Sequence, residues 1–293
     1  MAAYTTTRLL TAIERQSFAP ANQSTFSNTD ILELAGEVTK TMILPAIMGV
    51  REEFYLDYYD YSITSGTAAY AIPERSIGAS IREIQLVGAD GGISNLPRIS
   101  IDSLHLMGDV TGSPQAFYLR GNDVVLFPTP NTTSGTLRMY FPMRPGELVA
   151  TTSTAIIATI DTSTKIVTVT SIPSTWTTGN IFDLIQRNGS HVYLDTDLTS
   201  TLISGSSITL PSLPSTLAVG DYISLAGESS LVQMPPDFQP ILATLTAAEM
   251  LLAMNQPKGE KLYAKGMKQL EAAQAALTPR VVGEQELILP DWS

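Results

Sequence analysis

The chain has 293 residues, a formal net charge of −11 and no cysteine. This length is enough to bury a sizeable core in one large or two ordinary domains. The absence of cysteine excludes a disulfide framework and any thiolate metal site, and the acidic balance argues against a protein that holds nucleic acid through clustered Lys and Arg.

The amino-terminal residues MAAYTTTRLLTAIERQ lack the apolar core of a signal peptide. No uncharged apolar stretch is long enough to span a bilayer. We therefore expect a chain that is made in the cytoplasm and stays off membranes.

Two helical segments are expected before residue 55. Residues 5–16 form at most a short helix. Ser27 followed by Asp30 resembles a capping box, which marks a helix start. Apolar residues then recur at helical spacing on one face: Ile31, Leu34, Val38 and Met42. Pro45 falls inside this pattern, and we expect it to kink the helix, which resumes through Phe54.

An antiparallel β meander is expected from Tyr55 to Phe141. The segments YLDYYDYSIT, IREIQLV and LRMYF alternate like strands, and FYLR and DVVLF flank a tight turn at Gly121-Asn122. Tyrosines cluster in the first strand, and either an aromatic interface, a sugar-binding strip or simple sheet packing would explain them: Tyr55, Tyr58, Tyr59 and Tyr61.

Residues 149–232 are rich in Thr, Ser, Ile and Val. Short strands at regular spacing, with turn signals at 161–164 and at Asn188-Gly189, predict a small β-barrel or sandwich. We interpret this segment as a separate module inserted into the rest of the chain.

A helical hairpin is expected next. Asp237 can cap a helix whose apolar stripe contains Ile241, Leu245, Ala248 and Leu252. A break at residues 255–257 precedes a second helix over 258–277. With residues 30–54 as a third helix, the fold class is α+β: a helical bundle from the N-terminal helix and the C-terminal hairpin, an antiparallel β meander and the inserted module. The expected domains are 1–148 with 233–278, then 149–232, then 279–293.

The last segment, residues 279–293, has no helical period but ends in the apolar residues Leu287, Ile288, Leu289 and Trp292. A solvated tail rarely carries such a cluster. Two interpretations stay open: the tail docks on its own subunit, or it adds to a neighbouring chain as an extended segment.

Signals for catalysis or for a cofactor are weak. Asp195 and Asp197 near His191 could hold Ca²⁺, but no glycine-rich loop accompanies them, and solvated turn residues are expected instead. His105 has no evident partner. No G-x-S-x-G, H-E-x-x-H or P-loop motif occurs. We expect no catalytic, cofactor-binding or metal-ligating residues, although a paired-carboxylate glycosidase is defined in space and stays open.

The order of the segments resembles a known family. The kinked helix DILELAGEVTKTMILPAIMGVREEFYL is followed by YAIPERSIGASIREIQLV, by SPQAFYLRGNDVVLFPTP with Tyr118, Gly121, Pro128 and Pro130, by LRMYFPMRP and by the helical hairpin. This order is similar to that of the head-to-tail adaptors of tailed bacteriophages, also called head completion or connector proteins.

The resemblance implies a non-enzymatic virion protein at the neck, made in the host cytoplasm. It would bind the portal protein and a tail or second neck protein, and would form a homo-oligomeric ring, commonly of twelve copies. The bundle residues Ile31, Leu34, Val38, Ile241, Leu245 and Leu252 would serve packing, and the C-terminal tail would reach toward the portal. Double-stranded DNA would pass without specific binding, past acidic walls that repel its phosphates.

Two alternatives belong to other functional classes. One is a tail-associated or fibre-associated structural protein that binds glycans through residues 149–232. The other is a glycan hydrolase carried on the virion.

Overall fold

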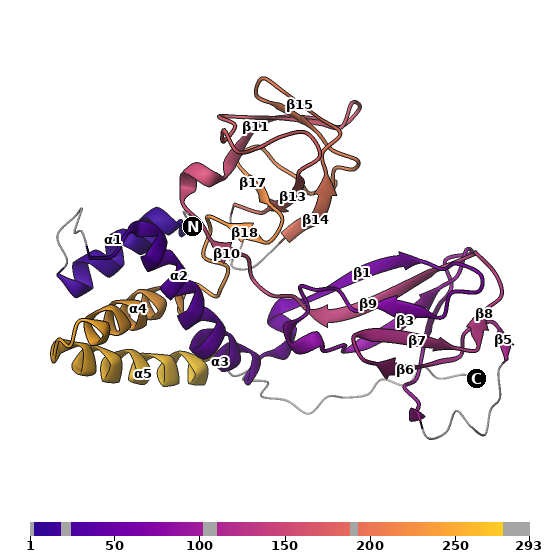
Figure 1. Cartoon of the computed structure of the whole chain (residues 1–293), viewed down its shortest axis with the longest axis horizontal. Helices are drawn as coiled ribbons and strands as arrows, with labels where there is room; N and C mark the ends of the chain where they lie inside the picture. The colour runs from indigo at the N-terminus through magenta and orange to yellow at the C-terminus, as the bar shows by residue number, and fades with distance from the viewer. Residues whose placement is uncertain (1–2, 19–24, 102–109, 188–192, 278–293) are drawn as a thin grey trace, which may run out of the picture.

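The computed structural model describes residues 3–18, 25–101, 110–187 and 193–277. The chain is α+β, and its three larger sheets are antiparallel, as the sequence predicts. Figure 1 shows three parts: a helical unit, a β meander that extends to one side of it, and a β module above the point where they join.

The helical unit combines segments from both ends of the chain. Its helices are α1 (Thr6–Ser17), α2 (Asn28–Val38), the π-helical turn η1 (Thr39–Ile43), α3 (Leu44–Met48), α4 (Gln239–Ala253) and α5 (Lys258–Leu277). A short 3-10 helix, η2 (Glu52–Tyr55), leads into the sheet.

The predicted capping box starts α2. Ser27 Oγ accepts a bond from the Asp30 N–H at 3.1 Å, and Asp30 Oδ2 accepts one from the Ser27 N–H at 2.7 Å. Pro45 does not end the helix, because it falls in the first turn of α3, where a proline loses no hydrogen bond, and the wider turn η1 precedes it. The helical path runs only to Met48; η2 is a separate turn.

Helix α4 lies at the centre of the helical unit and packs against α1, α2 and α5. It is buried on almost every side, not along one stripe, which is typical of a central helix. Helix α1 contributes more than expected from a short helix, because Leu9 and Ile13 are fully buried in the same core.

The β meander contains two antiparallel sheets. The first has the order β1-β9-β3-β4, and the second has the order β2-β7-β6. Their cores meet in one cluster that includes Ile84, Val124, Leu137 and Met139. The bounds are β1 (Leu56–Ser62), β2 (Ala69–Ala71), β3 (Glu83–Val87), β4 (Ile93–Asn95), β6 (Ala116–Arg120), β7 (Asp123–Phe127) and β9 (Thr136–Pro142).

The predicted hairpin at Gly121-Asn122 is confirmed. Arg120 pairs with Asp123 across the turn, and Gly121 has a φ of 61°, a conformation that glycine adopts without strain. Two further short strands, β5 (Thr111–Gly112) and β8 (Thr129–Pro130), pair in parallel beside it.

The β module has one seven-stranded sheet with the order β14-β13-β17-β11-β12-β16-β15. The expectation of a closed barrel is wrong, because the end strands β14 and β15 do not pair with each other. The sheet turns at β11, which pairs first with β17 and then, from Ile157 onward, with β12; a bulge interrupts this second pairing between Ile157 and Thr159. The bounds are β11 (Ala155–Asp161), β12 (Ile166–Val169), β13 (Ile181–Ile185), β14 (Tyr193–Thr199), β15 (Leu202–Ser204), β16 (Ser207–Thr209) and β17 (Tyr222–Leu225).

The two segments that lead into and out of the β module run side by side. Strand β10 (Glu147–Leu148) pairs in parallel with β18 (Glu228–Ser229). The 3-10 turn η5 (Thr151–Ser153) follows β10 and enters the sheet. Because the chain enters and leaves at one place, the orientation of the module depends on contacts made at this junction.

Candidate functional site

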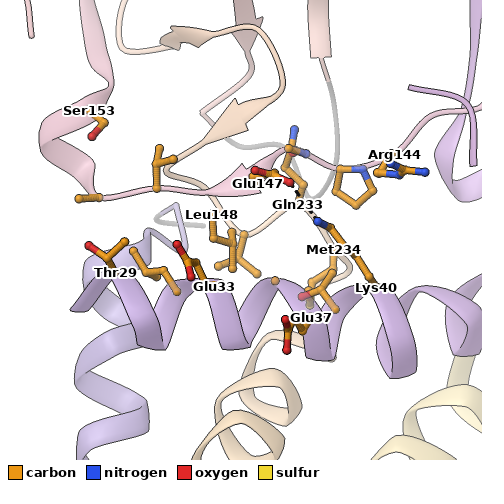
Figure 2. Close-up of a pocket in the computed structure, with 18 residues that line it drawn as sticks. Thr29, Glu33, Glu37, Lys40, Arg144, Glu147, Leu148, Ser153, Gln233 and Met234 are labelled. Carbon is orange, nitrogen blue, oxygen red and sulfur yellow. Dashed lines mark hydrogen bonds and ion pairs between the residues drawn. The ribbon is translucent and has the colours of Figure 1, made fainter. Parts of the chain in front are cut away.

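A cavity of about 460 Å³ lies at the junction, between α2 and the segments that connect the helical unit to the β module. Figure 2 shows α2 on one side and residues 144–150 on the other. The lining residues on α2 and η1 include Glu33, Gly36, Glu37 and Lys40, and those opposite include Arg144, Glu147, Leu148, Gln233 and Met234.

One ion pair spans the cavity. Lys40 Nζ lies 3.0 Å from Glu147 Oε1, as the dashed line in Figure 2 shows. Both side chains are well exposed, so this pair contributes little stability. Glu147 also lies opposite Glu228, where β10 pairs with β18. Burial raises the pKa of Glu228, and the negative charge of Glu147 adds a smaller effect in the same direction.

Behind the cavity, Gln233 is a buried polar connector with 3% of its surface exposed. Its Oε1 accepts a bond from the Gly146 N–H at 2.7 Å and another from the Tyr193 hydroxyl at 2.9 Å. Its backbone carbonyl accepts a bond from the Tyr55 hydroxyl at 3.0 Å. Gln233 therefore links three parts of the chain: η2 through Tyr55, the segment before β10 through Gly146, and the β module through Tyr193.

A buried ion pair reinforces this connection. Arg75 Nη1, from the β meander, lies 2.8 Å from Asp183 Oδ2 on β13. Asp183 also accepts bonds from the N–H groups of Gly227 and Asp197. Burial raises the pKa of Asp183, and the Arg75 charge opposes that shift. Because its lone pairs are used by one cation and two amides, the carboxylate is held in a single position.

The Arg75 guanidinium also stacks on an aromatic ring. Its central carbon lies 4.5 Å from the centre of the Tyr193 ring. Burial raises the pKa of Tyr193 to about 12, so its hydroxyl stays protonated and donates to Gln233 at neutral pH. We call Arg75, Asp183, Tyr193 and Gln233 the junction cluster.

The start of α1 makes hydrogen bonds to both connecting segments. The Thr6 N–H donates to the Ser230 carbonyl at 2.8 Å, and the Thr6 hydroxyl donates to the Val149 carbonyl at 2.8 Å. Thr154 and Ser230 share a buried hydroxyl bond of 2.6 Å. Both segments that enter the β module are therefore hydrogen-bonded to the helical unit.

Chemically, the site offers charged side chains around a partly apolar cavity and a rigid polar cluster behind it. In residues 3–18, 25–101, 110–187 and 193–277, His, Asp and Glu do not gather in a group of three that could hold a metal. Across the same residues, no helix is both long and apolar enough to cross a membrane. The arrangement is that of a surface which positions protein parts.

The residues expected to pack the bundle have different environments. Ile31, Val38, Ile241 and Leu245 are buried in the helical core, Leu34 packs partly against it, and Leu252 is half-buried. The part that these residues have in a ring stays a prediction. The tail residues Leu287, Ile288, Leu289 and Trp292, both histidines and the Asn188-Gly189 turn lie outside the described residues.

Asp195 and Asp197 both lie in strand β14. Asp195 accepts a bond from the Ser212 hydroxyl, and the Asp197 N–H donates to Asp183. The expected turn is wrong, because β14 continues through both residues, but the side chain of Asp197 is exposed as expected.

The tyrosines of the first strand divide into two groups. Tyr55 is buried, whereas Tyr58 is 49% exposed and Tyr59 is also exposed. Arg138 lies 4.3 Å from the centre of the Tyr58 ring and makes two bonds of 2.8 Å to the Asp60 carboxylate. Because consecutive residues of a strand point to opposite faces, Tyr58 and Tyr59 lie on opposite faces of β1, Tyr58 beside Tyr140 and Tyr59 beside Tyr61.

Sequence reasoning missed the junction cluster. Arg75 and Asp183 are 108 residues apart, and no local spacing links them. One signal was present: Asp183 lies between apolar neighbours in IFDLI, and a charge inside a buried strand requires a partner. The sequence alone could not say which cation supplies it.

The comparison with known families gives one match. The family model of the SU10 adaptor protein matches residues 42–180. This match supports a phage structural adaptor. It begins in η1, covers the whole β meander with Arg75, and ends just before β13, so the β module is matched only in part. No curated protein matches the chain.

Proposed function

We propose that the chain is a structural adaptor of a tailed-phage virion, which forms a ring between the portal and the tail through which double-stranded DNA passes. The match of residues 42–180 to the SU10 adaptor protein family carries this proposal. Its partners are the portal protein, a tail or second neck protein and further copies of itself. The role is structural and not enzymatic.

The junction supports such a role. An adaptor holds two partners in a fixed relation, so its parts must not swing freely. The buried pair Arg75–Asp183 and the bonds to Gln233 tie the β meander, the β module and the connecting segments together. A buried pair of this kind adds little net stability but favours one arrangement over others, which is the property an adaptor needs.

The charge of the chain suits a DNA passage. A net charge of −11 disfavours lasting contact with phosphates. If acidic side chains face the lumen, their neutralisation should slow packaging or ejection. Unchanged packaging and ejection in such variants would count against this use of the charge.

Antibody labelling of intact particles tests the proposed location. An antibody raised against this chain, with pre-immune serum as the control, is applied to particles viewed by negative-stain electron microscopy. We expect label confined to the neck, between head and tail. Label on fibres or at the tail tip would instead favour the glycan-binding alternative, and particles without label would contradict a virion role.

A further inference from the structure

The outer face of α5 carries a row of lysines. Lys258, Lys261, Lys265 and Lys268 are four of the six lysines of the chain. The last three are spaced four and three residues apart, so they lie on one side of the helix, and all three are exposed. The buried residues Gly266 and Leu270 are on the opposite side, against α4 and the core.

The outer face of α2 carries a row of acids. Asp30, Glu33 and Glu37 are spaced three and four residues apart and are all exposed, while Ile31, Ala35 and Val38 face the core. A groove of about 360 Å³ runs beside this row. It is lined by the three acids, by Glu249 and Ala253 of α4, and by the apolar side chains of Phe26 and Leu34.

Neither row is neutralised within the described part of one copy. The ion pairs found there involve Lys40, Arg75, Arg82 and Arg138, and none includes a lysine of the α5 row or an acid of the α2 row. Rows of one sign that stand three to four residues apart repel internally. Each row would therefore gain from a partner of opposite charge.

The two rows lie on different helices and make no ion pair with each other in the described residues. Helices α2 and α5 pack on α4, and Figure 1 shows them on its two sides. The lysine row lies on the side of α5 opposite its buried residues, whereas the acidic row borders the groove that α2 forms with α4. A contact between two different faces of identical chains is heterologous, and this is the type of contact that builds a ring.

The direction of the helices fits such a contact. Both α2 and α5 run toward α3: α2 continues into it through η1, and Gln274 near the end of α5 donates to the Ala46 carbonyl of α3. Neighbouring copies in a large ring differ by a small rotation, so α5 of one copy and α2 of the next would run in the same general direction.

The spacing of the charges fits as well. Each row spans seven residues, about 10.5 Å along a helix. With the helices parallel, Lys261 faces Asp30 and Lys268 faces Glu37. Lys265 and Glu33 are then offset by one residue, which long side chains can cover. The lysine stems can pack along Phe26 and Leu34 while their charged ends meet the carboxylates.

We propose that the lysine face of α5 in one copy docks on the acidic face of α2 in the next copy. The proposal rests on the proposed function in one respect, that copies of the chain assemble side by side. The paired charges set which faces meet and in which register, and the apolar groove beside α2 supplies the buried area.

Charge reversal in pairs tests the interface. One variant carries Glu33→Lys and Glu37→Lys, and the other carries Lys265→Glu and Lys268→Glu, the two lysines that lie nearest those acids in the proposed register. Asp30 is left unchanged because it caps α2. All four positions are exposed, so both variants should fold, which circular dichroism checks. Each variant alone places like charges at two of the three charge pairs of every interface and keeps the pair between Lys261 and Asp30. A mixture restores opposite charges at all three pairs if the copies alternate.

Sedimentation equilibrium of the full chain, at low ionic strength and up to millimolar concentration, gives the readout. We expect the association constant of each variant to fall at least about tenfold below that of the wild type. An equimolar mixture of the two variants should recover most of this lost affinity. Glu74→Lys and Arg15→Glu, which reverse exposed charges on other surfaces, are the matched controls and should associate like the wild type.

Carbodiimide cross-linking of mixed ¹⁴N and ¹⁵N wild-type chains identifies the contact directly, because the reagent joins lysine amines to carboxylates. Links between chains from the α5 row to the α2 row would support the proposal. Links between chains that involve only other residues would overturn this interface but would not contradict the proposed ring. A wild-type chain that stays monomeric and forms no such links would contradict both.

Discussion

The helical unit and the β module are stabilised in different ways. The helical unit gathers distant segments around α4, whose residues are apolar and buried on nearly all sides. The β module closes a separate core of its own around Phe182, Leu184 and Ile223, and meets the rest of the chain through polar contacts. Apolar burial thus maintains each part, while the junction cluster fixes how the parts are placed.

This difference predicts two kinds of damage. A substitution in either core should lower the free energy of unfolding of that part. A substitution in the junction cluster should instead release the β module, with both cores still folded. The four predictions below separate these outcomes.

The largest effect is expected from Leu245→Asp. Leu245 is fully buried between α4 and α5, so the variant places an unpaired charge in an apolar core. We expect a loss of about 4 kcal/mol or more in the free energy of unfolding, measured by urea titration. Leu202→Asp is the matched control: Leu202 is 55% exposed on the β module and should lose little. A wild-type transition for Leu245→Asp would refute a buried α4.

A smaller but more specific effect is expected from Arg75→Met. The variant leaves Asp183 buried with no cation beside it, which costs about 3–5 kcal/mol. Because both cores are intact, the thermal transition should split into two, and limited proteolysis should cut near residues 144–150 and 226–232. Arg82→Met, which removes only exposed ion pairs with Glu52 and Glu53, is the control.

A second substitution checks the cause. Asp183→Asn removes the buried charge while its amide oxygen still accepts from the backbone N–H groups of Gly227 and Asp197. Arg75→Met combined with Asp183→Asn should therefore recover most of the loss. If the double variant is no better than Arg75→Met alone, stacking on Tyr193 and not the ion pair holds the junction.

Two glycines in helices should respond in opposite directions to alanine. At Gly266 of α5, a Cβ would lie 2.5 Å from Leu245 Cδ2, inside a filled core. Gly266→Ala should cost about 1–3 kcal/mol by overpacking. At Gly36 of α2 nothing lies within 4 Å of the added atom. Gly36→Ala should raise the free energy of unfolding by up to about 1 kcal/mol, since alanine favours helix. Paired urea titrations decide both signs.

The sequence predicts the two parts unequally. Periodicity and local signals correctly indicated the capping box at Ser27, the turn at Gly121-Asn122 and the helices α4 and α5, because each depends on neighbouring residues. It underestimated α1, since Leu9 and Ile13, the two apolar residues of α1 that are fully buried, give too short a pattern to show how deeply the helix is buried.

The remaining misses depend on contacts between distant residues. Strand patterns in residues 149–232 do not reveal which end strands pair, so a barrel and a sandwich were both left open, and the structure excludes only the closed barrel. The junction cluster was invisible for the same reason: Tyr193 and Gln233 are 40 residues apart, and Arg75 is further still from Asp183. The single local hint was the charge of Asp183 in an apolar strand.

The smallest effect is expected at the entrance to the β module, where Glu228 lies beside Glu147. Burial and, to a lesser degree, the Glu147 charge raise the pKa of Glu228 in the folded chain. Between its unfolded and folded pKa values the folded chain therefore binds more protons than the unfolded chain. The stability that this group contributes is complete below the unfolded pKa and is lost as pH rises through the folded one.

Glu228→Gln should remove this dependence. At pH 7 the variant should gain less than about 1 kcal/mol in the free energy of unfolding, because Glu228 is half-buried and solvent screens the repulsion. Below the unfolded pKa the two proteins should be equally stable. Thermal melts of both proteins over that pH range, with Glu74→Gln as an exposed control, measure the difference. An equal gain at every pH would show that repulsion from Glu147 and burial of the charge do not act here, and that only the shape of the side chain matters.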